Sequence, residues 1–338
     1  MDKLTEKNLS ETGFEVVGRP RYIALQPAVE KDQISSVDKV LLFGNKIYVA
    51  DKFLKKLTVY DSTGRLQQHI GKKGHGPGEY VDISDFSIDP RGNIYVLDNQ
   101  TLSLLKYDSA GIHLQTVKMP FRSDAFQCLS HGKFIFSLPA LGKENRPADQ
   151  LLLTGNNLKT EKVLLQYDSP TDENFRLSGF GFQKTTQGIF YHKPIDDHVY
   201  VLDESGNLTH VYYFDFGKRR VPESDKQNVE SKVENRFGNY TTLTFFTIVG
   251  KKYIYLSLFD RGEYKQALVD LRKNILYTKS DETVDPYGHF IAYCDSTLIG
   301  YIPNVFEGNI PADYPPDLKT VLKQGNPVLC LYSIGENS

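Results

Sequence analysis

The sequence predicts an all-β protein, a six-bladed β-propeller of four-stranded antiparallel blades whose ring is closed by an N-terminal strand that completes the last blade. Three observations lead to this fold class. The 338 residues include 21 Tyr and 20 Phe, and aromatic residues are enriched in strands. A unit of short strands repeats along the chain, and repeats of about 40 to 50 residues have the length of one propeller blade. An unpartnered strand near the start fits the gap in the last unit.

The repeat is clearest in the first two units. "NKIYVADKFLKKLTVYDSTGRLQQHI" begins at Asn45, and "GNIYVLDNQTLSLLKYDSAGIHLQTV" begins at Gly92. Both contain Ile-Tyr-Val-x-Asp and then Tyr-Asp-Ser-x-Gly, so that Asp51 corresponds to Asp98 at an offset of 47 residues (98 − 51). Alternating apolar residues between Gly, Asn and Asp turns mark the strands. The glycine of each Ser-x-Gly turn is expected to have a positive φ.

Weaker copies continue the pattern to the C-terminus. The expected blades span residues 37–70, 83–119, 124–166, 179–214, 242–280 and 289–334. The sixth supplies only three strands, whereas "RYIALQP" at 21–27 reads as a strand without a partner. Placed as the outer strand of the sixth blade, it would close the ring and remove exposed sheet edges. We therefore expect residues 1–20 to be an N-terminal extension and 21–338 to be a single propeller domain.

Insertions interrupt this pattern. Residues 222–240 are polar with weak helical periodicity, and residues 304–324 contain a proline-rich turn and a short helix. A long loop at 140–150 interrupts the third unit. We expect surface excursions rather than a second domain, although long insertions can be functional.

Composition narrows the classes of partner and location. A net charge of −2 argues against nucleic acid, which calls for a clustered basic surface. Cys128, Cys294 and Cys330 are scattered among apolar neighbours, which favours buried free thiols over disulfides or a zinc site. No apolar run reaches the ~20 residues of a transmembrane helix. The first residues, "MDKLTEKNLSE", lack a signal-peptide pattern. The protein is therefore either cytoplasmic or exported by a signal that is not part of this sequence.

Three stretches carry a resemblance to a known family. They are "IGKKGHGPGEYVDISDFSID" (70–89), the "IYVLD…YDSAG" frame, and the terminal "NPVLCLYSI". In them the chain resembles the six-bladed β-propeller proteins of Bacteroides-type bacteria, which are distantly similar to NHL-repeat propellers. Gly-x-Gly-Pro-Gly-Glu-Tyr after an outer strand is the hallmark of that family. The resemblance runs from about Arg21 to Ile334 and is strongest over the first two blades.

The resemblance implies a location more than an activity. Such proteins are typically exported, often as lipoproteins, which implies a periplasmic or cell-surface location. No lipobox cysteine lies near the start of this sequence, so the implication depends on residues before Met1. The family brings no established activity or catalytic residues.

The glycine-rich stretch "GKKGHGPGEY" (71–80) is not a phosphate loop, because Pro77 and Gly78 stand where a P-loop has Lys-Ser/Thr and no helix follows. In antiparallel blades, the link between blades lies on the same face as the loop between the second and third strands. Glycines let the backbone cross closely over its neighbours. One interpretation is that the stretch only makes this crossing. The other is that its side chains also bind a ligand, with Glu79 near the entrance of the central channel.

Charged and polar residues on this face form the candidate ligand-binding set: Lys72, His75, Glu79, Asp51, Asp98, Arg122, Arg146, His192 and Arg261. Asp51 and Asp98 recur directly after the second strand of their units. They are either turn-capping residues or part of a carboxylate ring that binds a divalent cation at the central channel. Pro139 and Pro303 occupy the corresponding places in two other blades, which counts against a complete ring. No catalytic residue and no other cofactor is predicted.

The first functional hypothesis is a non-catalytic binding propeller of the bacterial cell envelope. It would hold a small molecule, a glycan or a protein partner through the loop-rich face, and it would act as a monomer. The alternative is a metal-assisted hydrolase or lyase that acts at the channel mouth, since lactonases and lyases occur on this fold. A regulatory or sensory domain is a third hypothesis, which the absence of an output module weakens.

Overall fold

A computed structural model gives the structure of the protein. It describes residues 5–8, 20–139, 149–167, 181–193, 195–226, 239–249, 253–273, 275–280, 289–294, 297–303, 310–312 and 314–333. The chain divides into two compact units. The terminal unit comprises Val17–Phe121 and Thr283–Gly335, and the middle unit comprises Met1–Val16, Arg122–Glu282 and Glu336–Ser338.

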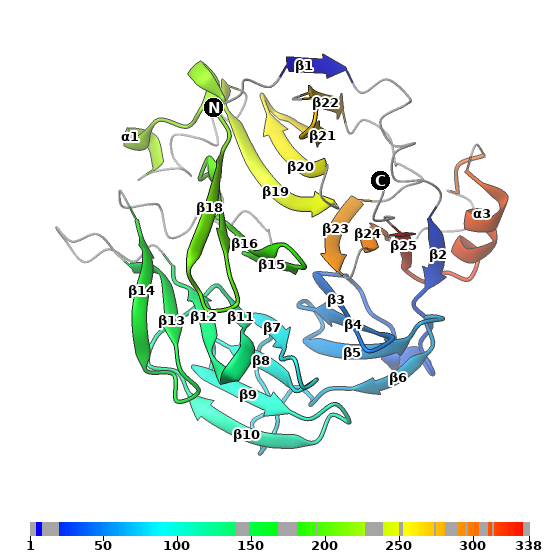
Figure 1. Cartoon of the computed structure of the whole chain (residues 1–338). Coiled ribbons are helices and arrows are strands. Elements are labelled where there is room, and N and C mark those ends of the chain that lie inside the picture. The colour runs from blue at the N-terminus through cyan, green and yellow to red at the C-terminus, as the bar shows by residue number, and fades with distance from the viewer. Residues whose placement is uncertain are drawn as a thin grey trace. The chain divides into compact units, whose positions relative to one another are not determined.

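The terminal unit contains three four-stranded antiparallel sheets (Figure 1). Blade 1 consists of β3 (Lys39–Phe43), β4 (Lys46–Asp51), β5 (Lys56–Asp61) and β6 (Leu66–His69). Blade 2 consists of β7 (Asp85–Ile88), β8 (Ile94–Asp98), β9 (Ser103–Tyr107) and β10 (His113–Lys118). Blade 6 consists of β23 (His289–Cys294), β24 (Thr297–Ile302), β25 (Val328–Ser333) and β2 (Arg21–Ala24).

The middle unit contains the other three sheets. Blade 3 consists of β11 (Ala125–Cys128), β12 (Phe134–Ser137), β13 (Asp149–Thr154) and β14 (Thr160–Gln166). Blade 4 consists of β15 (Phe182–Thr185), β16 (Gly188–His192), β17 (His198–Leu202) and β18 (Leu208–Tyr213). Blade 5 consists of β19 (Thr241–Val249), β20 (Tyr253–Asp260), β21 (Glu263–Asp270) and β22 (Ile275–Ser280).

These sheets confirm the predicted fold class, an all-β six-bladed propeller with four antiparallel strands in each blade. The predicted closing strand is also confirmed, because β2 pairs antiparallel with β25, from Arg21 opposite Leu331 to Ala24 opposite Val328. One strand was not predicted. β1 (Thr5–Asn8) pairs in parallel with β22 and extends blade 5 to five strands. Its sequence, TEKN, has no alternation of apolar residues that could have marked it as a strand.

The sheets pack through apolar side chains. In the terminal unit one buried cluster joins Tyr48 and Leu57 of blade 1 to Phe86 and Val96 of blade 2. Strand alternation sets these side chains on the faces where neighbouring sheets meet. The two blades are therefore held together by a continuous core beneath their connecting loops.

Aspartates fix the turns between the third and fourth strands, as the repeat predicted. Asp61 Oδ1 accepts hydrogen bonds from the backbone N–H groups of Thr63 and Arg65 at 2.8 and 3.1 Å. Gly64 in the same turn has a φ of +86°, a conformation that glycine adopts without steric cost. A Cβ on Gly64 would also overlap the carbonyl oxygen of Ala24, so the residue is required on both grounds.

The described parts of the insertions contain short helices: α1 (Glu223–Lys226) and α3 (Pro316–Leu322). The predicted short helix inside blade 6 thus exists, and it buries Leu318 and Leu322. Three short 3-10 helices lie at Glu30–Asp32, Ser130–Gly132 and Gly217–Arg219. Among the residues that the structure describes, no helix is both long and apolar enough to span a membrane.

Candidate functional site

The two recurring aspartates cap the loops of blades 1 and 2. The carboxylate of Asp51, at the end of β4, is 0% exposed. It accepts hydrogen bonds from the backbone N–H groups of Ser35 at 2.6 Å, Ser36 at 3.3 Å and Leu54 at 2.7 Å. The hydroxyl groups of Ser35 and Ser36 donate two more. Asp51 thereby ties the link that leads into β3 to the loop between β4 and β5.

These hydrogen bonds also decide the charge of Asp51. Burial alone would raise its pKa, but the donors from Leu54, Ser35 and Ser36 outweigh burial and hold the pKa below its ordinary value. The carboxylate is therefore ionised and surrounded by donors of its own chain. The capping interpretation accounts for every one of these contacts.

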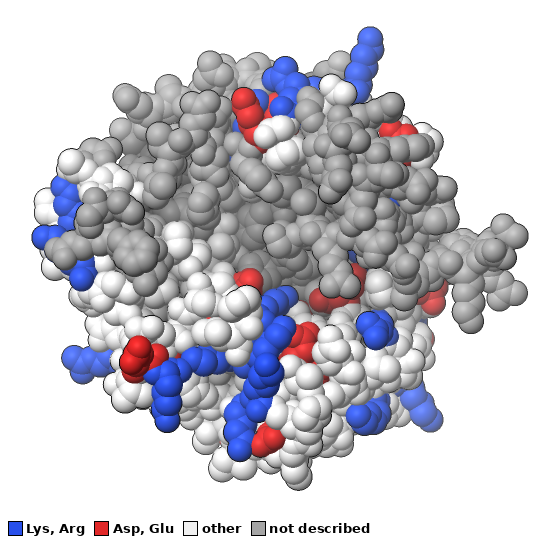
Figure 2. All heavy atoms as spheres, turned by 180° about the vertical axis from the view of Figure 1, so that it is seen from behind, with Lys and Arg blue, Asp and Glu red and all other residues white. Residues whose placement is uncertain are grey.

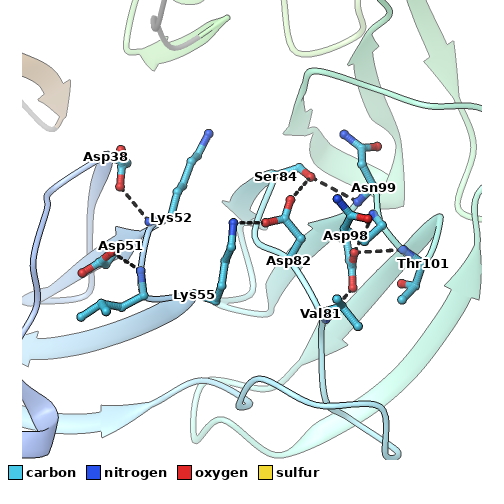
Figure 3. Close-up of polar contacts among 12 residues, drawn as sticks. Asp38, Asp51, Lys52, Lys55, Val81, Asp82, Ser84, Asp98, Asn99 and Thr101 are labelled. Carbon is cyan, nitrogen blue, oxygen red and sulfur yellow. Dashed lines mark hydrogen bonds and ion pairs between the residues drawn. The ribbon is translucent and has the colours of Figure 1, made fainter.

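Asp98 occupies the same place at the end of β8 and is also 0% exposed. Its Oδ2 accepts the backbone N–H of Val81 at 2.8 Å, and its Oδ1 accepts those of Gln100 at 2.8 Å and Thr101 at 3.1 Å. The link between blades is thus joined to the loop between the second and third strands in both blades (Figure 3). This contact confirms that the two kinds of loop share a face.

Blades 1 and 2 share a second pair of polar residues, one serine and one aspartate two positions apart. The order of the two residues in the sequence is reversed between the blades. In blade 1, Asp38 Oδ2 accepts the backbone N–H of Lys52 at 2.7 Å and the hydroxyl of Ser36 at 2.7 Å. In blade 2, Ser84 Oγ accepts the backbone N–H of Asn99 at 3.2 Å and donates to Asp82 Oδ2 at 2.9 Å. The first residue after each strand-end aspartate is therefore anchored at its backbone.

Ion pairs join the two blades. Lys55, in the loop after β4, pairs with Asp82 in the link before β7 (Figure 3). Burial tends to raise the pKa of Asp82, but the contacts with Lys55 and Ser84 hold it below the ordinary value. Beneath them, Lys39 Nζ lies 2.6 Å from Asp85 Oδ1, with both side chains at most 6% exposed. This pair joins the first strands of the two blades.

The glycine-rich stretch folds back on itself. Gly74 N–H donates to the Tyr80 carbonyl at 2.9 Å, and Tyr80 N–H donates to the Lys72 carbonyl at 3.1 Å. Tyr80 is buried, and its hydroxyl donates to the carbonyl of Ile70 at 3.0 Å. Gly78, with a φ of +73°, lies where a Cβ would approach His113 of β10 within 2.7 Å. The stretch thus lies against the outer part of blade 2.

Glu79 is bound inside this stretch. Lys72 Nζ lies 2.9 Å from Glu79 Oε1, and the backbone N–H of Gly76 donates to Oε2 at 2.9 Å. The pairing with Lys72, followed by the Gly76 N–H, lowers the pKa of Glu79. A Cβ on Gly74 would overlap the carboxylate, so glycine at this position makes room for it. Glu79 is therefore paired with a basic residue of its own loop, Lys72.

The side chains left at the surface differ from these capping groups. We define the loop surface as residues 52–55, 70–84 and 99–102. On it Phe53 is 80% exposed and Leu54 is 37% exposed. His75 and Lys73 are exposed, whereas Lys52 is half-buried. Figure 3 shows the side chain of Lys52 standing away from Asp51 and on the same side as the side chain of Asn99.

The candidate ligand-binding residues of the middle unit differ from one another in burial and in their contacts. His192 is 8% exposed, and its Nε2 lies 3.1 Å from the carbonyl oxygen of Asp196. Burial lowers the pKa of His192 to about 4, so its ring is neutral at pH 7. Arg261 has a φ of +54° and lies beside Asp260, with Nη2 3.6 Å from Oδ2. Arg122 is exposed, and Arg146 lies outside the described residues.

A further polar cluster lies between blades 3 and 4, and no sequence pattern had pointed to it. Lys193 Nζ lies 3.1 Å from Asp124 Oδ2 and 2.6 Å from the carbonyl oxygen of Leu138, and it also contacts the hydroxyl of Tyr167. These three oxygens match the three N–H bonds of an ammonium group. We interpret the cluster as a tie between neighbouring blades.

Charge on the molecule is mixed. Figure 2 shows Lys and Arg side chains beside Asp and Glu side chains on the described part of one face, as a net charge of −2 would lead one to expect. Across the described ranges, no group of three or more His, Cys, Asp and Glu side chains is arranged to hold a metal ion. Asp51 and Asp98 direct their carboxylates to backbone N–H groups instead.

Comparison with known proteins places the chain among structures of the same fold. A crystal structure of the "Putative exported protein" of Bacteroides fragilis matches with a TM-score of 0.80 at 15% identity, over 96% of this chain and 97% of that chain. A member of the DUF4221 family from Bacteroides vulgatus matches with a TM-score of 0.59 at 11% identity, over 93% and 96%. A gluconolactonase from Xanthomonas campestris matches with a TM-score of 0.50 at 10% identity, over 98% and 94%.

At these identities the likeness shows the fold alone. None of the curated proteins compared with the sequence matches it significantly. The sequence itself matches the family described as "Domain of unknown function (DUF4934)" over residues 1–333. Since that match spans nearly the whole chain, the protein belongs to the DUF4934 family.

Proposed function

We propose that the chain is a non-catalytic ligand-binding protein of the bacterial cell envelope, and that it binds through the loop surface of blades 1 and 2. The observation that carries the proposal is the position of Phe53. This aromatic side chain is 80% exposed on a loop whose backbone Asp51 and Asp38 hold in place from below.

A fixed loop favours binding because less conformational freedom is lost when a ligand arrives. Single apolar residues are common on protein surfaces and need no explanation by themselves. Here, however, the residues on either side of Phe53 are both held at their backbone, Lys52 by Asp38 and Leu54 by Asp51. Loops held by a rigid scaffold are the usual place for recognition residues. Phe53 is thus exposed to a ligand on a loop whose backbone is already held.

The hydrogen bonds and the burial of the Asp51 and Asp98 carboxylates favour a binding function over metal-assisted hydrolysis or elimination at these two residues. A metal ligand or a general base needs an oxygen with a free lone pair facing the substrate. Asp51 and Asp98 use both oxygens on backbone N–H groups and are fully buried. The likeness to a gluconolactonase concerns the fold and brings no residue to this surface.

The cell-envelope location is part of the same proposal. The match to a Bacteroides fragilis protein described as exported supports it, as does the resemblance of the sequence to exported propellers. Fractionation of the native host cells, with detection by an antibody against the purified chain, tests this part. Recovery in the periplasmic or surface fraction is the expected result, whereas recovery in the cytoplasm alone would contradict it.

The binding proposal is tested with arrays of glycans and peptides probed with the purified protein. We expect Phe53→Ala to reduce binding at least tenfold. Leu208→Ala is the matched control, because Leu208 is 46% exposed on β18 of the middle unit and is not one of the loop-surface residues. Equal loss in both variants, or no loss in either, would refute the role of Phe53. Turnover of lactone substrates by the wild-type protein would contradict the non-catalytic part.

A further inference from the structure

We infer that blade 5 carries an anion site, formed by Arg219, Arg261 and Lys265, that binds a phosphate or sulfate group. The site lies in the middle unit and does not involve the loop surface, so the inference goes beyond the proposed function. It rests on the positive charge gathered around one buried carboxylate, on the fixed backbone of the cationic residues, and on the N–H bonds that they leave for a ligand.

Asp260 is the centre of this site. It ends β20 and is 5% exposed, in the position that Asp51 and Asp98 have in blades 1 and 2. Those two aspartates accept backbone N–H groups, whereas Asp260 accepts from charged side chains. Within the described residues, three cations contact its carboxylate: Lys265 Nζ lies 2.7 Å from Oδ2, Arg219 Nη1 lies 3.2 Å from Oδ1, and Arg261 Nη2 lies 3.6 Å from Oδ2.

These contacts leave a surplus of positive charge. Burial tends to raise the pKa of Asp260, but the hydrogen bonds from Lys265 and Thr241 hold the pKa below its ordinary value, so the carboxylate is ionised at pH 7. Among the described residues, the other carboxylate in ion-pair contact with the three cations is that of Glu263, with Oε2 3.9 Å from Lys265 Nζ. Three cations thus face two carboxylates, and one of these is 60% exposed at its side chain.

The cationic residues are held by regular backbone structure. Arg261 and Gly262 form a two-residue turn between β20 and β21, with φ values of +54° and +90°. Asn and Gly are the residues preferred in such a turn, so the turn does not explain an arginine at its first position. The backbone N–H of Arg261 donates to the carbonyl of Tyr240 at 3.0 Å. Arg219 ends a 3-10 helix, and Lys265 lies within β21.

The guanidinium groups retain N–H bonds for a ligand. A guanidinium has five N–H bonds in a planar fork. In the part of the chain that the structure describes, Asp260 is the acceptor in contact with the Arg219 and Arg261 side chains, which are 42% and 59% exposed. Arg219 contacts it through Nη1, which leaves Nε and Nη2 to donate side by side. The contact of Arg261 is longer than an ordinary hydrogen bond.

A tetrahedral oxyanion fits this set of donors. Arginine binds phosphate oxygens through two parallel N–H bonds, and lysine adds a compact positive charge. One guanidinium can occupy both oxygens of a carboxylate, whereas a phosphate or sulfate group offers oxygens to several cations at once. Asp260 then serves to orient the guanidinium groups from the buried side of the site. The site therefore matches a phosphate or sulfate group, free or as an ester.

The opposite end of β21 provides a matched control. There Asp270 accepts the backbone N–H groups of Arg272 and Lys273 at 3.0 and 3.2 Å. The guanidinium of Arg272 lies over the ring of Tyr253, and its Nη2 donates to the Tyr253 hydroxyl at 3.0 Å. Arg272 is thus an arginine of the same blade beside an aspartate, but its side chain already has an acceptor outside the ion pair.

The experiment titrates inorganic phosphate, sulfate and acetate into the full chain by calorimetry at low ionic strength. We expect phosphate and sulfate to bind and acetate to bind about tenfold more weakly. Arg261→Gln should weaken phosphate binding about tenfold, because a hydrogen bond to a charged group is lost, whereas Arg272→Gln should leave it unchanged. Glu263→Gln should tighten phosphate binding roughly threefold, since it removes a negative charge beside the site.

Further arms identify the source of the anion and separate this site from the loop surface. Binding of glycerol 3-phosphate as tight as that of inorganic phosphate supports a site for phosphate esters, and weaker binding supports a site for the free ion. Phe53→Ala should bind phosphate as the wild type does, so a failure of either proposal leaves the other standing. Absence of phosphate and sulfate binding, equal binding of acetate, or equal losses in Arg261→Gln and Arg272→Gln would overturn the anion site.

Discussion

Replacement of Asp51 by Asn tests whether the strand-end carboxylate holds the loop surface together. The change keeps the shape of the side chain, but one acceptor oxygen becomes an NH₂ group that faces donors. If that group takes the place of Oδ1, the hydrogen bond from Leu54 N–H is lost, and its present length is 2.7 Å. The bonds to the remaining oxygen weaken because the acceptor is no longer charged.

The expected cost follows from these contacts. A hydrogen bond to a charged group contributes about 1.5–3 kcal/mol to stability, and a buried donor without a partner costs about 1–3 kcal/mol. We therefore expect Asp51→Asn to lower the free energy of unfolding by about 3 kcal/mol. For a protein of 338 residues, that corresponds to a fall in Tm of roughly 4 °C. Thermal unfolding followed by circular dichroism at pH 7 measures the shift.

Two controls separate capping from a general effect of mutation. Asp61→Asn changes a half-buried turn aspartate that also accepts backbone N–H bonds, and it should cost less than about 1 kcal/mol because Asn is well tolerated in turns. The pKa of Asp51 is lowered in the folded state, so its contribution is present above the unfolded pKa near 4 and is lost as the pH falls through the folded pKa. The difference between wild type and Asp51→Asn should shrink below pH 4. Equal Tm values for wild type and Asp51→Asn at pH 7 would refute the reasoning.

Three further predictions concern single contacts. Lys39→Met should destabilise the protein by about 3–5 kcal/mol in urea unfolding, because it removes the lysine that forms an ion pair with the buried Asp85 carboxylate, and adding Asp85→Leu should restore most of the loss. Gly74→Ala should lower Tm because the new Cβ would overlap the Glu79 carboxylate. The fall in Tm should be much smaller when Gly74→Ala is introduced into a Glu79→Ala variant. An equal fall in both backgrounds would argue against the contact between residue 74 and Glu79. Burial raises the pKa of Asp197 to about 6, so its effect on stability becomes less favourable as the pH rises from about 4 to 6. The free energy of unfolding of Asp197→Asn, taken relative to that of wild type, should therefore be higher at pH 7 than at pH 4. A difference between the two proteins that does not change with pH would argue against a raised pKa of Asp197.

The fold was predictable because its signals are local and repeated. Each turn between the third and fourth strands needs an acceptor and a residue with positive φ, so Asp61 and Gly64 recur at fixed offsets in the next blade. The closing strand could be assigned because the sixth unit supplied only three strands and residues 21–27 formed a strand pattern without a partner. β1 could not be predicted, because its four polar residues have no strand pattern and it forms by pairing with the edge of β22.

The site was predictable only in part. Topology placed the links and loops on one face, whereas the recurrence of Asp51 and Asp98 left two interpretations open, turn capping and a carboxylate ring. The closure of Glu79 on its own loop depends on the approach of the carboxylate to Gly74, a through-space contact without a sequence pattern. The exposure of Phe53 likewise has no signal, because aromatic residues in this chain are mostly core residues. Candidate ligand roles for Lys72, His75, Arg122 and Arg261 stay predictions.

The most direct test of the account is hydrogen–deuterium exchange of the full chain with and without the glycan or peptide that binds most tightly on the arrays. Binding at the loop surface predicts slower exchange in the backbone amides of residues 52–55 and in the neighbouring amides of 99–102, with little change in blades 3 to 5. The same protection should be absent in Phe53→Ala. Protection that falls in the middle unit, or that persists in Phe53→Ala, would contradict the claim that this surface is the binding site.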